Sequence, residues 1–270
     1  MPSSPHDATS EPAPVLRGLL PPSTEVSVER LVDDLDLIER GAESRSRPYL
    51  ALNMISSTDG RATLGGRSGG LGGRADSLLL HGLRTTVDAV MAGAGTVRAE
   101  RYSRLVCEER DRKTRRERGL AEEPLVCVVS GRLALSKEIP LLADRDAHVA
   151  IITASNASLP QECRAQIEYI RAAREGALDL RAALEELRER FGVRTLLCEG
   201  GPHLNSHLLA GGLVDELFLT LSPKLAGGDA TSEALGIVSG PELEPPFKLA
   251  LLAVHEHESY LFLRYRVIPS

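Results

Sequence analysis

From Pro48 onward, short apolar runs alternate with longer stretches in which apolar residues recur every three or four positions. The short runs are typical of buried β-strands, and the longer stretches are typical of amphipathic helices. The expected strands are "YLALNMI" (49–55), "DAVMAG" (88–93), "PLVCVVS" (124–130), "HVAIIT" (148–153) and "RTLLCEG" (194–200). Strands separated by helices form parallel sheets with crossover connections, so this pattern predicts an α/β fold.

Two helices are predicted between these strands. The first covers "RADSLLLHGLRTTV" (74–87). The second begins after Asp179, whose side chain can cap a helix, and ends at Gly192. The first is preceded by a long glycine-rich loop, "SSTDGRATLGGRSGGLGG" (56–73), whose length indicates a functional or mobile segment.

The C-terminal part has a different pattern. Three strand-like runs, "DELFLTLSP", "KLALLAVHEHE" and "SYLFLRYRV", follow one another without a helical stretch between them. We therefore expect antiparallel strands, ending in a hairpin, to complete a mostly parallel central sheet that is flanked by helices. Residues 45–270 contain no internal repeat and are expected to form a single domain.

The N-terminal part is expected to add little to that domain. Residues 25–44 predict a helix and a linker, because Val28, Leu31, Val32, Leu35 and Ile38 share one helical face. Gly41 is the expected end of this helix. Residues 1–24 are rich in proline and have few large apolar side chains before Val15, which predicts a flexible tail.

Composition excludes several classes of function. The chain has 270 residues and a net charge of −6, which argues against general nucleic-acid binding. No apolar run approaches the roughly 18–20 residues of a membrane span. The N-terminus lacks the features of a signal peptide. The four cysteines form no CxxC pair and are expected to be reduced thiols, so we expect a cytoplasmic protein.

Glycine-rich turns follow two of the expected strands. "GAGTVR" begins at Gly93, and "EGGPHL" places Glu199 beside Gly200 and Gly201 at the start of a helix. Ligands of open α/β sheets bind beyond the carboxyl ends of the strands, and helix N-termini present free N–H groups to phosphate. Either turn alone is better explained by ordinary turn chemistry. The two together favour a dinucleotide that bridges them.

The turns do not form a Rossmann fingerprint. "GAGTVR" has Arg98 in place of the third glycine, and no acidic residue follows the second strand. That strand ends instead in Ser130 and Arg132, which can hold a 2′-phosphate, because a guanidinium matches phosphate geometry. This favours NADPH over NADH as the cofactor.

Four segments, taken in order and spacing, resemble a known family. They are "RPYLALNMISSTDGRAT", "LRTTVDAVMAGAGTVRAE", "VVSGRLAL" and "LLCEGGPHLNSHLLAGGLVDELFLTLSPKLAGG". They are similar to the reductase (C-terminal) domain of bacterial riboflavin-biosynthesis proteins, the pyrimidine reductase family, which has a dihydrofolate reductase-like fold. The deaminase signatures H-x-E and P-C-x-x-C are absent, so a stand-alone reductase is expected.

The resemblance implies an NADPH-dependent reductase that transfers hydride to a C=N bond of a small pyrimidine-type substrate. The implied substrate is the ribosylaminouracil phosphate of riboflavin synthesis. A homodimer without nucleic-acid or membrane partners is also implied. The implied catalytic residues are Glu199 and Asp59. Together with the turns above, the candidate cofactor-binding residues are Ile55, Gly70, Gly93, Gly95, Thr96, Glu100, Ser130, Arg132, Gly200, Gly201, Pro202, His203 and Leu204.

The candidate substrate-binding residues include two departures from the family. Ser68 and Arg84 match substrate-contacting positions. Asn53 stands where the family usually has a lysine. The segment after Thr96 also differs, so Arg104 is only a candidate for holding the ribose phosphate. These differences lie on the substrate side, and they leave two alternatives open. One is a reductase of another heterocycle, such as dihydrofolate, and the other is a non-catalytic NADP(H)-binding protein.

Three further motifs favour simpler explanations. "GRSGG" fits G-x-S-x-G, but Ser68 lies in a long loop rather than in the strand–turn–helix of a serine hydrolase. His203 and His207 lie four residues apart on one helix, without the glutamate of HExxH, so no metal site is expected. The basic run 110–118 is typical of a solvated loop, with an anionic ligand as the alternative.

Overall fold

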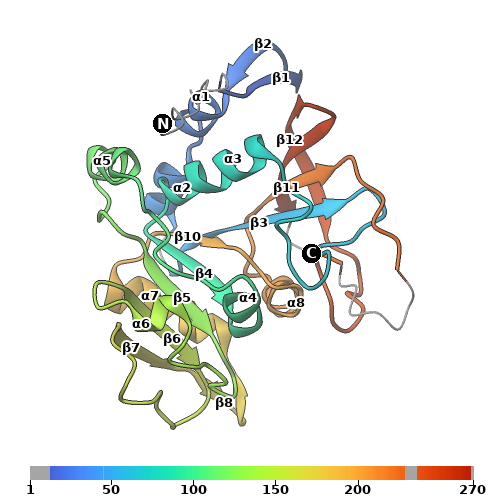
Figure 1. Ribbon diagram of the computed structural model, residues 1–270. Coiled ribbons are helices and arrows are strands. Elements are labelled where there is room, and N and C mark those ends of the chain that lie inside the picture. Colours follow the sequence, from blue (N-terminus) through green and yellow to red (C-terminus); the bar gives the residue numbers. More distant parts are fainter. Residues whose placement is uncertain (1–12, 45, 229–235, 269–270) are drawn as a thin grey trace, which may run out of the picture.

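The structure, a computed structural model, describes residues 13–44, 46–228 and 236–268 (Figure 1). Eleven of the described strands form one sheet in the order β2-β1-β12-β13-β11-β3-β10-β4-β5-β6-β7. These strands are β1 (Val15–Leu20), β2 (Pro22–Ser27), β3 (Tyr49–Ser57), β4 (Ala89–Gly93), β5 (Leu125–Val129), β6 (His148–Thr153), β7 (Gln166–Arg171), β10 (Thr195–Cys198), β11 (Glu216–Ser222), β12 (Lys248–His257) and β13 (Tyr260–Ile268). A separate small hairpin consists of β8 (Ala173–Arg174) and β9 (Ala177–Leu178).

The sheet has a parallel part and an antiparallel part, as predicted. From β11 through β3, β10, β4, β5 and β6 to β7, every neighbouring pair is parallel. The pairs that involve β13, β12, β1 and β2 are antiparallel. The helices are α1 (Val28–Asp33), α2 (Leu37–Glu43), α3 (Arg74–Arg84), α4 (Ala94–Ala99), α5 (Glu109–Glu117), α6 (Pro140–Ala143), α7 (Leu180–Phe191) and α8 (Pro202–Ala210).

The parallel strands are buried on both faces. Ala51 of β3 belongs to the core cluster that includes residues of α1 and α3, whereas its neighbours Leu50 and Leu52 belong to the cluster that includes residues of α7 and α8. Continuous apolar runs are expected for strands that are covered by helices on both sides. Helix α7 begins where predicted, because the Asp179 side chain accepts the Ala182 N–H at 3.0 Å, and Gly192 ends it with φ +66°.

The central strand β10 ends early, and this creates space at the carboxyl edge of the sheet. β10 has four residues and lies between β3, which has nine, and β4. Cys198, its last residue, pairs with Leu52 and Met91, so β3 continues beyond it. The loops that follow β3, β4 and β10 therefore meet at one crevice, which is the usual ligand position in such sheets.

The N-terminal prediction was wrong for the residues that the structure describes. Residues 15–24 belong to the hairpin of β1 and β2, and β1 pairs with β12. This pairing covers an otherwise exposed sheet edge and buries Leu16 completely. Two of the prolines that suggested a tail, Pro21 and Pro22, occupy the hairpin turn and the first position of β2, where strands tolerate proline. Residues 1–12 lie outside the described residues.

The predicted helix over residues 28–41 is divided into α1 and α2. The break lies at Asp34–Asp36, where the Asp36 carboxylate accepts hydrogen bonds from Arg40 and Arg264, each at 2.7 Å. Gly41 does not end α2, which continues to Glu43. A Cβ at Gly41 would lie 2.3 Å from the Thr195 side chain, so glycine permits close packing of the helix on β10.

Candidate active site

Two adjoining cavities occupy the crevice above β10. We name the first the charged cavity; it has a volume of about 320 Å³. The predicted site residues that line it are Asn53, Ile55, Ser68, Arg84, Thr96, Glu100, Arg104 and Glu199. We name the second the glycine cavity; it has a volume of about 540 Å³. The predicted site residues that line it are Ser68, Gly93, Gly95, Thr96, Glu100, Glu199, Gly201, Pro202, His203 and Leu204.

Glu199 lies at the junction of the two cavities in a buried ion pair. Arg84, the last residue of α3, donates from Nε and Nη2 to the two Glu199 carboxylate oxygens, each at 2.8 Å. The Tyr102 hydroxyl also donates to Glu199 Oε2. The side chains of Arg84 and Glu199 are 12% and 7% exposed. Glu199 is thus a fixed negative charge that faces the crevice.

The pKa values of its two partners follow from this geometry. Burial alone would lower the pKa of Arg84, but the Glu199 charge and its hydrogen bonds raise it above the ordinary value. Burial, followed by the Glu199 charge, raises the pKa of Tyr102 well above its ordinary value. Both donors therefore keep their protons, and the carboxylate remains able to accept one more hydrogen bond from a ligand.

The diglycine turn lies directly against the end of β4. Gly200 has φ +85°, a region that glycine adopts readily, and its carbonyl accepts the Gly93 N–H at 2.7 Å. Helix α8 begins at Pro202, with Gly201 as its N-cap. A Cβ at Gly201 would lie 2.8 Å from Thr96 Oγ1, so a side chain at this position would crowd the glycine cavity.

Ser68 connects the glycine-rich loop to α4. Its backbone N–H and its hydroxyl donate to Glu100 Oε1 at 2.7 and 3.0 Å. Glu100 is the C-cap of α4, so this contact closes the loop over both cavities. Because the Ser68 hydroxyl is engaged by a carboxylate, this contact gives no support to the serine hydrolase alternative.

Several predicted site residues lie outside both cavities: Asp59, Gly70, Ser130, Arg132 and Gly200. Asp59 accepts hydrogen bonds from the Ser57 hydroxyl at 2.5 Å and from the N–H groups of Ala226 and Gly227 at 3.0 and 2.7 Å. These bonds, that of Ser57 first, hold the pKa of Asp59 well below its ordinary value. Through these hydrogen bonds, Asp59 fixes the loop that follows β11.

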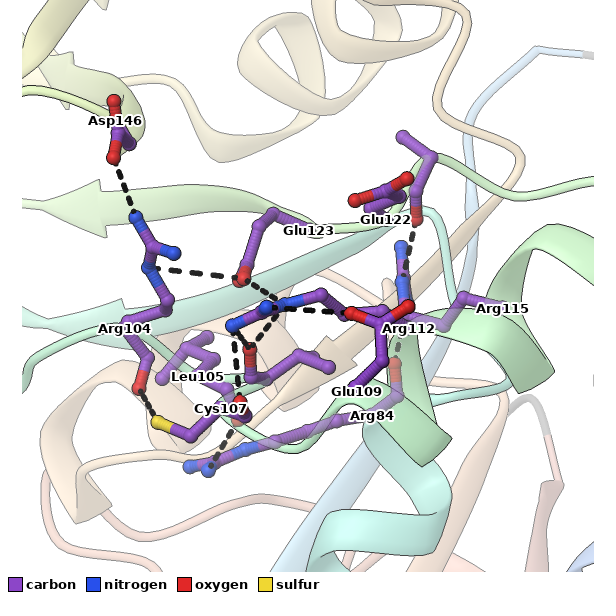
Figure 2. Close-up of polar contacts among 12 residues, drawn as sticks. Arg84, Arg104, Leu105, Cys107, Glu109, Arg112, Arg115, Glu122, Glu123 and Asp146 are labelled. Carbon is purple, nitrogen blue, oxygen red and sulfur yellow. Dashed lines mark hydrogen bonds and ion pairs between the residues drawn. The ribbon is translucent and has the colours of Figure 1, made fainter.

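Arg104 lines the charged cavity but is held by acidic side chains of other segments. It forms ion pairs with Asp146 at 3.0 Å, Asp144 at 3.5 Å and Glu123 at 3.8 Å. Figure 2 shows its guanidinium reaching toward Glu123 and Asp146. Its charge is therefore largely neutralised by the protein itself.

The basic run is a helix, α5, whose arginines bind the end of α3. The Arg115 side chain is fully buried and donates to the carbonyls of Arg84, Val87 and Ala121. Burial lowers the pKa of Arg115 to about 10, so it remains charged at neutral pH. Arg118 donates to the Thr85 carbonyl and hydroxyl. Cations at the C-terminus of a helix satisfy its last carbonyls, so α5 helps to position Arg84.

Sequence reasoning missed several residues of the charged cavity, among them Tyr102 and Asp76. Asp76, Leu80 and Arg84 all line this cavity and are spaced four residues apart on α3, so they share one helix face. That spacing is a signal which the sequence contained. Asp76 is largely buried, and burial raises its pKa, although the Thr220 hydrogen bond opposes the shift. No comparable signal marked Tyr102, because its partner Glu199 is 97 residues away in the sequence.

Other predicted features have simple structural roles. His203 lines the glycine cavity, and its Nδ1 lies 2.9 Å from the Ser239 carbonyl oxygen. His207 Nδ1 lies 2.7 Å from the His203 carbonyl oxygen. The four cysteines are free, and Cys127 and Cys198 are buried. None of the helices in the described part of the chain is long and apolar enough to span a membrane.

Comparisons with known proteins identify the family of this chain. The family model of the RibD C-terminal domain matches residues 48–251. Two relatives are named 2,5-diamino-6-ribosylamino-4(3H)-pyrimidinone 5′-phosphate reductase. The protein from Methanothermobacter thermautotrophicus is 30% identical over 67% of this chain and 81% of its own length. The protein from Archaeoglobus fulgidus is 31% identical over 67% of this chain and 83% of its own length.

A solved structure confirms the fold over nearly the whole chain. It is the crystal structure of a pyrimidine reductase-like protein from Corynebacterium diphtheriae. The TM-score is 0.72 and the identity is 25%, with 91% of this chain and 100% of that chain covered. The predicted fold class is therefore confirmed.

Proposed function

The chain belongs to the RibD C-terminal domain family, and we propose that it is an NADPH-dependent reductase of 2,5-diamino-6-ribosylamino-4(3H)-pyrimidinone 5′-phosphate. The sequence pointed to the corresponding aminouracil, whereas the relatives named above favour the diaminopyrimidinone. The observation that supports the proposal most directly is the junction of the two cavities at Glu199. A nicotinamide in the glycine cavity would meet a pyrimidine in the charged cavity at this point.

The glycine cavity suits a dinucleotide. A Cβ at Gly95 would meet no atom within 4 Å, so the backbone there is open to a close ligand. The first turn of α8 supplies N–H groups to the same cavity, and these favour a pyrophosphate. Gly93, Gly95 and Gly201 would hold the cofactor through the backbone, and His203 and Leu204 would border it.

The preference for NADPH rests on the turn after β5. Ser130 directly follows this strand and is 5% exposed, and Arg132 lies in the exposed turn after it. A serine hydroxyl and a guanidinium suit the 2′-phosphate that distinguishes NADPH from NADH. We assign both residues to the adenosine end of the cofactor, which would extend beyond the glycine cavity.

The chemistry is the reduction of a C=N bond in the open-chain form of the ribosylamino group. The bound cofactor supplies hydride to the carbon. The chain must orient the pyrimidine and deliver a proton to the nitrogen. Glu199, fixed by Arg84 and Tyr102, would accept a ring N–H or amino hydrogen bond. Asp76 has a raised pKa because it is buried, so it keeps its proton to higher pH than an exposed aspartate, as a proton donor requires.

We further propose that the protein is a cytoplasmic homodimer. Leu249 and Leu251 of β12 and Ile268 of β13 are 43%, 42% and 36% exposed. Apolar side chains on adjacent strands favour coverage by a second copy. A monomer in light scattering at micromolar concentration would contradict the dimer. The reduced state of the four cysteines is the basis for the compartment.

The decisive experiment follows NADPH oxidation by the purified protein with three substrates in parallel. These are the diaminopyrimidinone phosphate, the aminouracil phosphate and dihydrofolate. We expect turnover with the diaminopyrimidinone phosphate at the highest kcat/KM. Turnover with dihydrofolate alone would support a reductase of another heterocycle. NADPH binding without turnover of any of the three would support a non-catalytic protein.

A further inference from the structure

The charged cavity is lined by three arginines, and two of them are neutralised by the protein. Arg84 is paired with Glu199 through two hydrogen bonds of 2.8 Å. Arg104 forms ion pairs with three carboxylates within 4 Å, two of which, Glu123 and Asp146, are labelled in Figure 2. Moving Arg84 to a ligand would leave the buried Glu199 carboxylate unpaired, which is costly. Moving Arg104 would leave three clustered, partly exposed carboxylates without the cation that they share. Neither arginine is therefore available to a new anion.

The third arginine, Arg101, is in a different state. Its side chain lines the same cavity and is exposed, and it forms no hydrogen bond or ion pair with any residue that the structure describes. Five guanidinium N–H groups are thus available to a ligand. Arg101 is the lining cation whose charge is not already balanced by a described carboxylate.

The backbone at Arg101 is held in an unfavourable conformation. Its φ is +52°, in the left-handed region that glycine adopts without cost and that other residues seldom occupy. The following residue is firmly fixed: the Tyr102 N–H donates to the Val97 carbonyl at 3.0 Å, and its hydroxyl donates to Glu199. Arg101 thus carries a long cationic side chain at a position that favours glycine, and, unlike Glu175 with the same φ, it lines the charged cavity.

Arg101 and Ser103 flank Tyr102, and both line the charged cavity. Because Tyr102 binds Glu199, a pyrimidine held by Glu199 would place its ribosyl chain near this segment. An arginine and a serine hydroxyl are suitable donors to a phosphate monoester. Resting on the proposed function, we infer that Arg101 recognises the 5′-phosphate of the substrate, in place of Arg104, which the sequence had suggested.

The test compares Arg101→Gly with two controls. Arg101→Gly removes the guanidinium and relieves the backbone. Glu175→Gly is the matched control, because Glu175 also has φ +52° and lies in the turn between β8 and β9, outside both cavities. Arg104→Ala removes the other candidate arginine. Kinetics are measured with the phosphorylated substrate and with its dephosphorylated nucleoside, and melting temperatures are measured for all variants.

In Arg101→Gly we expect KM for the phosphorylated substrate to rise at least about tenfold, the loss expected for a charge-assisted contact. KM for the nucleoside should not change, and the melting temperature should stay equal or rise. Glu175→Gly should keep both KM values, and Arg104→Ala should retain the preference for the phosphorylated substrate. Equal KM changes for both substrates in Arg101→Gly would overturn the inference, and so would loss of the preference in Arg104→Ala alone.

A binding measurement separates this inference from the proposed function. Ribose 5-phosphate and ribose are titrated into the NADP⁺-saturated protein by calorimetry. Weaker binding of ribose 5-phosphate in Arg101→Gly, with Glu175→Gly unchanged, would support the phosphate site even if the pyrimidine is not reduced. If the wild type reduces the pyrimidine while ribose 5-phosphate binds equally to Arg101→Gly, the phosphate assignment fails and the proposed function stands.

Discussion

The glycine cavity and the charged cavity share the lining residues Thr96, Glu100 and Glu199. They differ in what else lines them: glycine backbone in the first, and charged side chains in the second. The glycine cavity owes its shape to missing side chains in turns that directly follow β4 and β10. The charged cavity owes its shape to long side chains fixed by distant partners, and Arg84 and Glu199 are 115 residues apart in the sequence. The shape of the glycine cavity therefore depends on short stretches of sequence, whereas the shape of the charged cavity depends on the whole fold.

The sharpest test of this difference is Glu199→Gln, for which we expect the largest effect. The change keeps the shape but leaves the Arg84 charge unpaired. Breaking a buried pair costs about 3 kcal/mol, so the free energy of unfolding should fall by that order. Turnover should fall roughly tenfold to several hundredfold with the loss of one charge-assisted hydrogen bond. NADPH affinity should change little, because in the proposed site backbone groups would hold the cofactor.

Asp215→Asn is the matched control for Glu199→Gln. Asp215 forms an equally close pair with Arg47, at 2.7 and 2.9 Å, but lines neither cavity. It should lower stability and leave turnover per folded molecule unchanged. A stable, fully active Glu199→Gln protein would remove Glu199 from the site.

Gly201→Val tests the other half and should show the reverse pattern. The new side chain would crowd Thr96 and enter the glycine cavity. Because the side chain would occupy space that the ligand needs, we expect a roughly tenfold to hundredfold loss of NADPH affinity by fluorescence titration, about 1.4–2.8 kcal/mol. Gly69→Val is the control, because a Cβ at Gly69 would meet no atom within 4 Å and Gly69 lines neither cavity. Unchanged NADPH binding in Gly201→Val would rule out a cofactor on the diglycine turn.

Arg132→Ala concerns the adenosine end of the cofactor, where a smaller effect is expected. The wild type should bind NADPH at least about tenfold more tightly than NADH, and the variant should lose about tenfold of this preference. Affinity for NADH should stay the same. Arg174→Ala, another exposed arginine, serves as the control. Equal NADPH and NADH affinities in the wild type would refute the assignment of the 2′-phosphate to this turn.

Asp76→Asn should have the smallest effect, and it should raise the stability of the protein at neutral pH while it lowers turnover. Burial raises the pKa of Asp76 above its ordinary value of 3.8, so the folded protein binds this proton more tightly than the unfolded chain. The stability that this group contributes is present below pH 3.8 and is lost as the pH rises through the folded pKa. At neutral pH the variant should therefore melt at a higher temperature, and the gain should vanish in acid. Turnover should fall.

The control for Asp76→Asn is Asp111→Asn. Both aspartates lie in the first turn of a helix, but Asp111 lines neither cavity. It should show no gain in melting temperature at neutral pH and no loss of turnover. If Asp76→Asn melts at a lower temperature than the wild type at neutral pH, the buried carboxyl stabilises the fold, and its role as proton donor loses its basis.

Much of the fold was predictable because its signals are local. The apolar runs of β3, β4, β5, β6 and β10 each lie in one short segment, and so do the caps of α7 at Asp179 and Gly192. The N-terminal hairpin was not predictable in this way. Its strands are stabilised by pairing with β12, which lies more than 200 residues away in the sequence. The proline content therefore suggested a flexible tail, although β1 pairs with β12 in the folded protein.

In the candidate site, too, the features with local sequence signals were predicted, and those that depend on distant residues were not. The glycine turns and Glu199 were found from the sequence, because a bare backbone after a buried strand is a local pattern. The ion pairs of Arg104 could not be predicted, because Glu123, Asp144 and Asp146 surround it only in the folded chain. Tyr102 was missed for the same reason. The basic run was expected to be a loop, but it folds as α5 because its arginines find the carbonyl groups at the end of α3.

By itself, the sequence determined the family, the parallel core of the sheet and the positions at which the backbone is open to a cofactor. These depend on residue spacing, apolar periodicity and glycine, which act over a few neighbouring residues. Only the tertiary structure decided which charges are neutralised and which face the substrate. Arg84, Arg101 and Arg104 are equivalent cations in the sequence, and the fold distinguishes them by the carboxylates that it brings within about 4 Å of each. Electrostatic pairing depends on distance in space, and the chain sets that distance only when it folds.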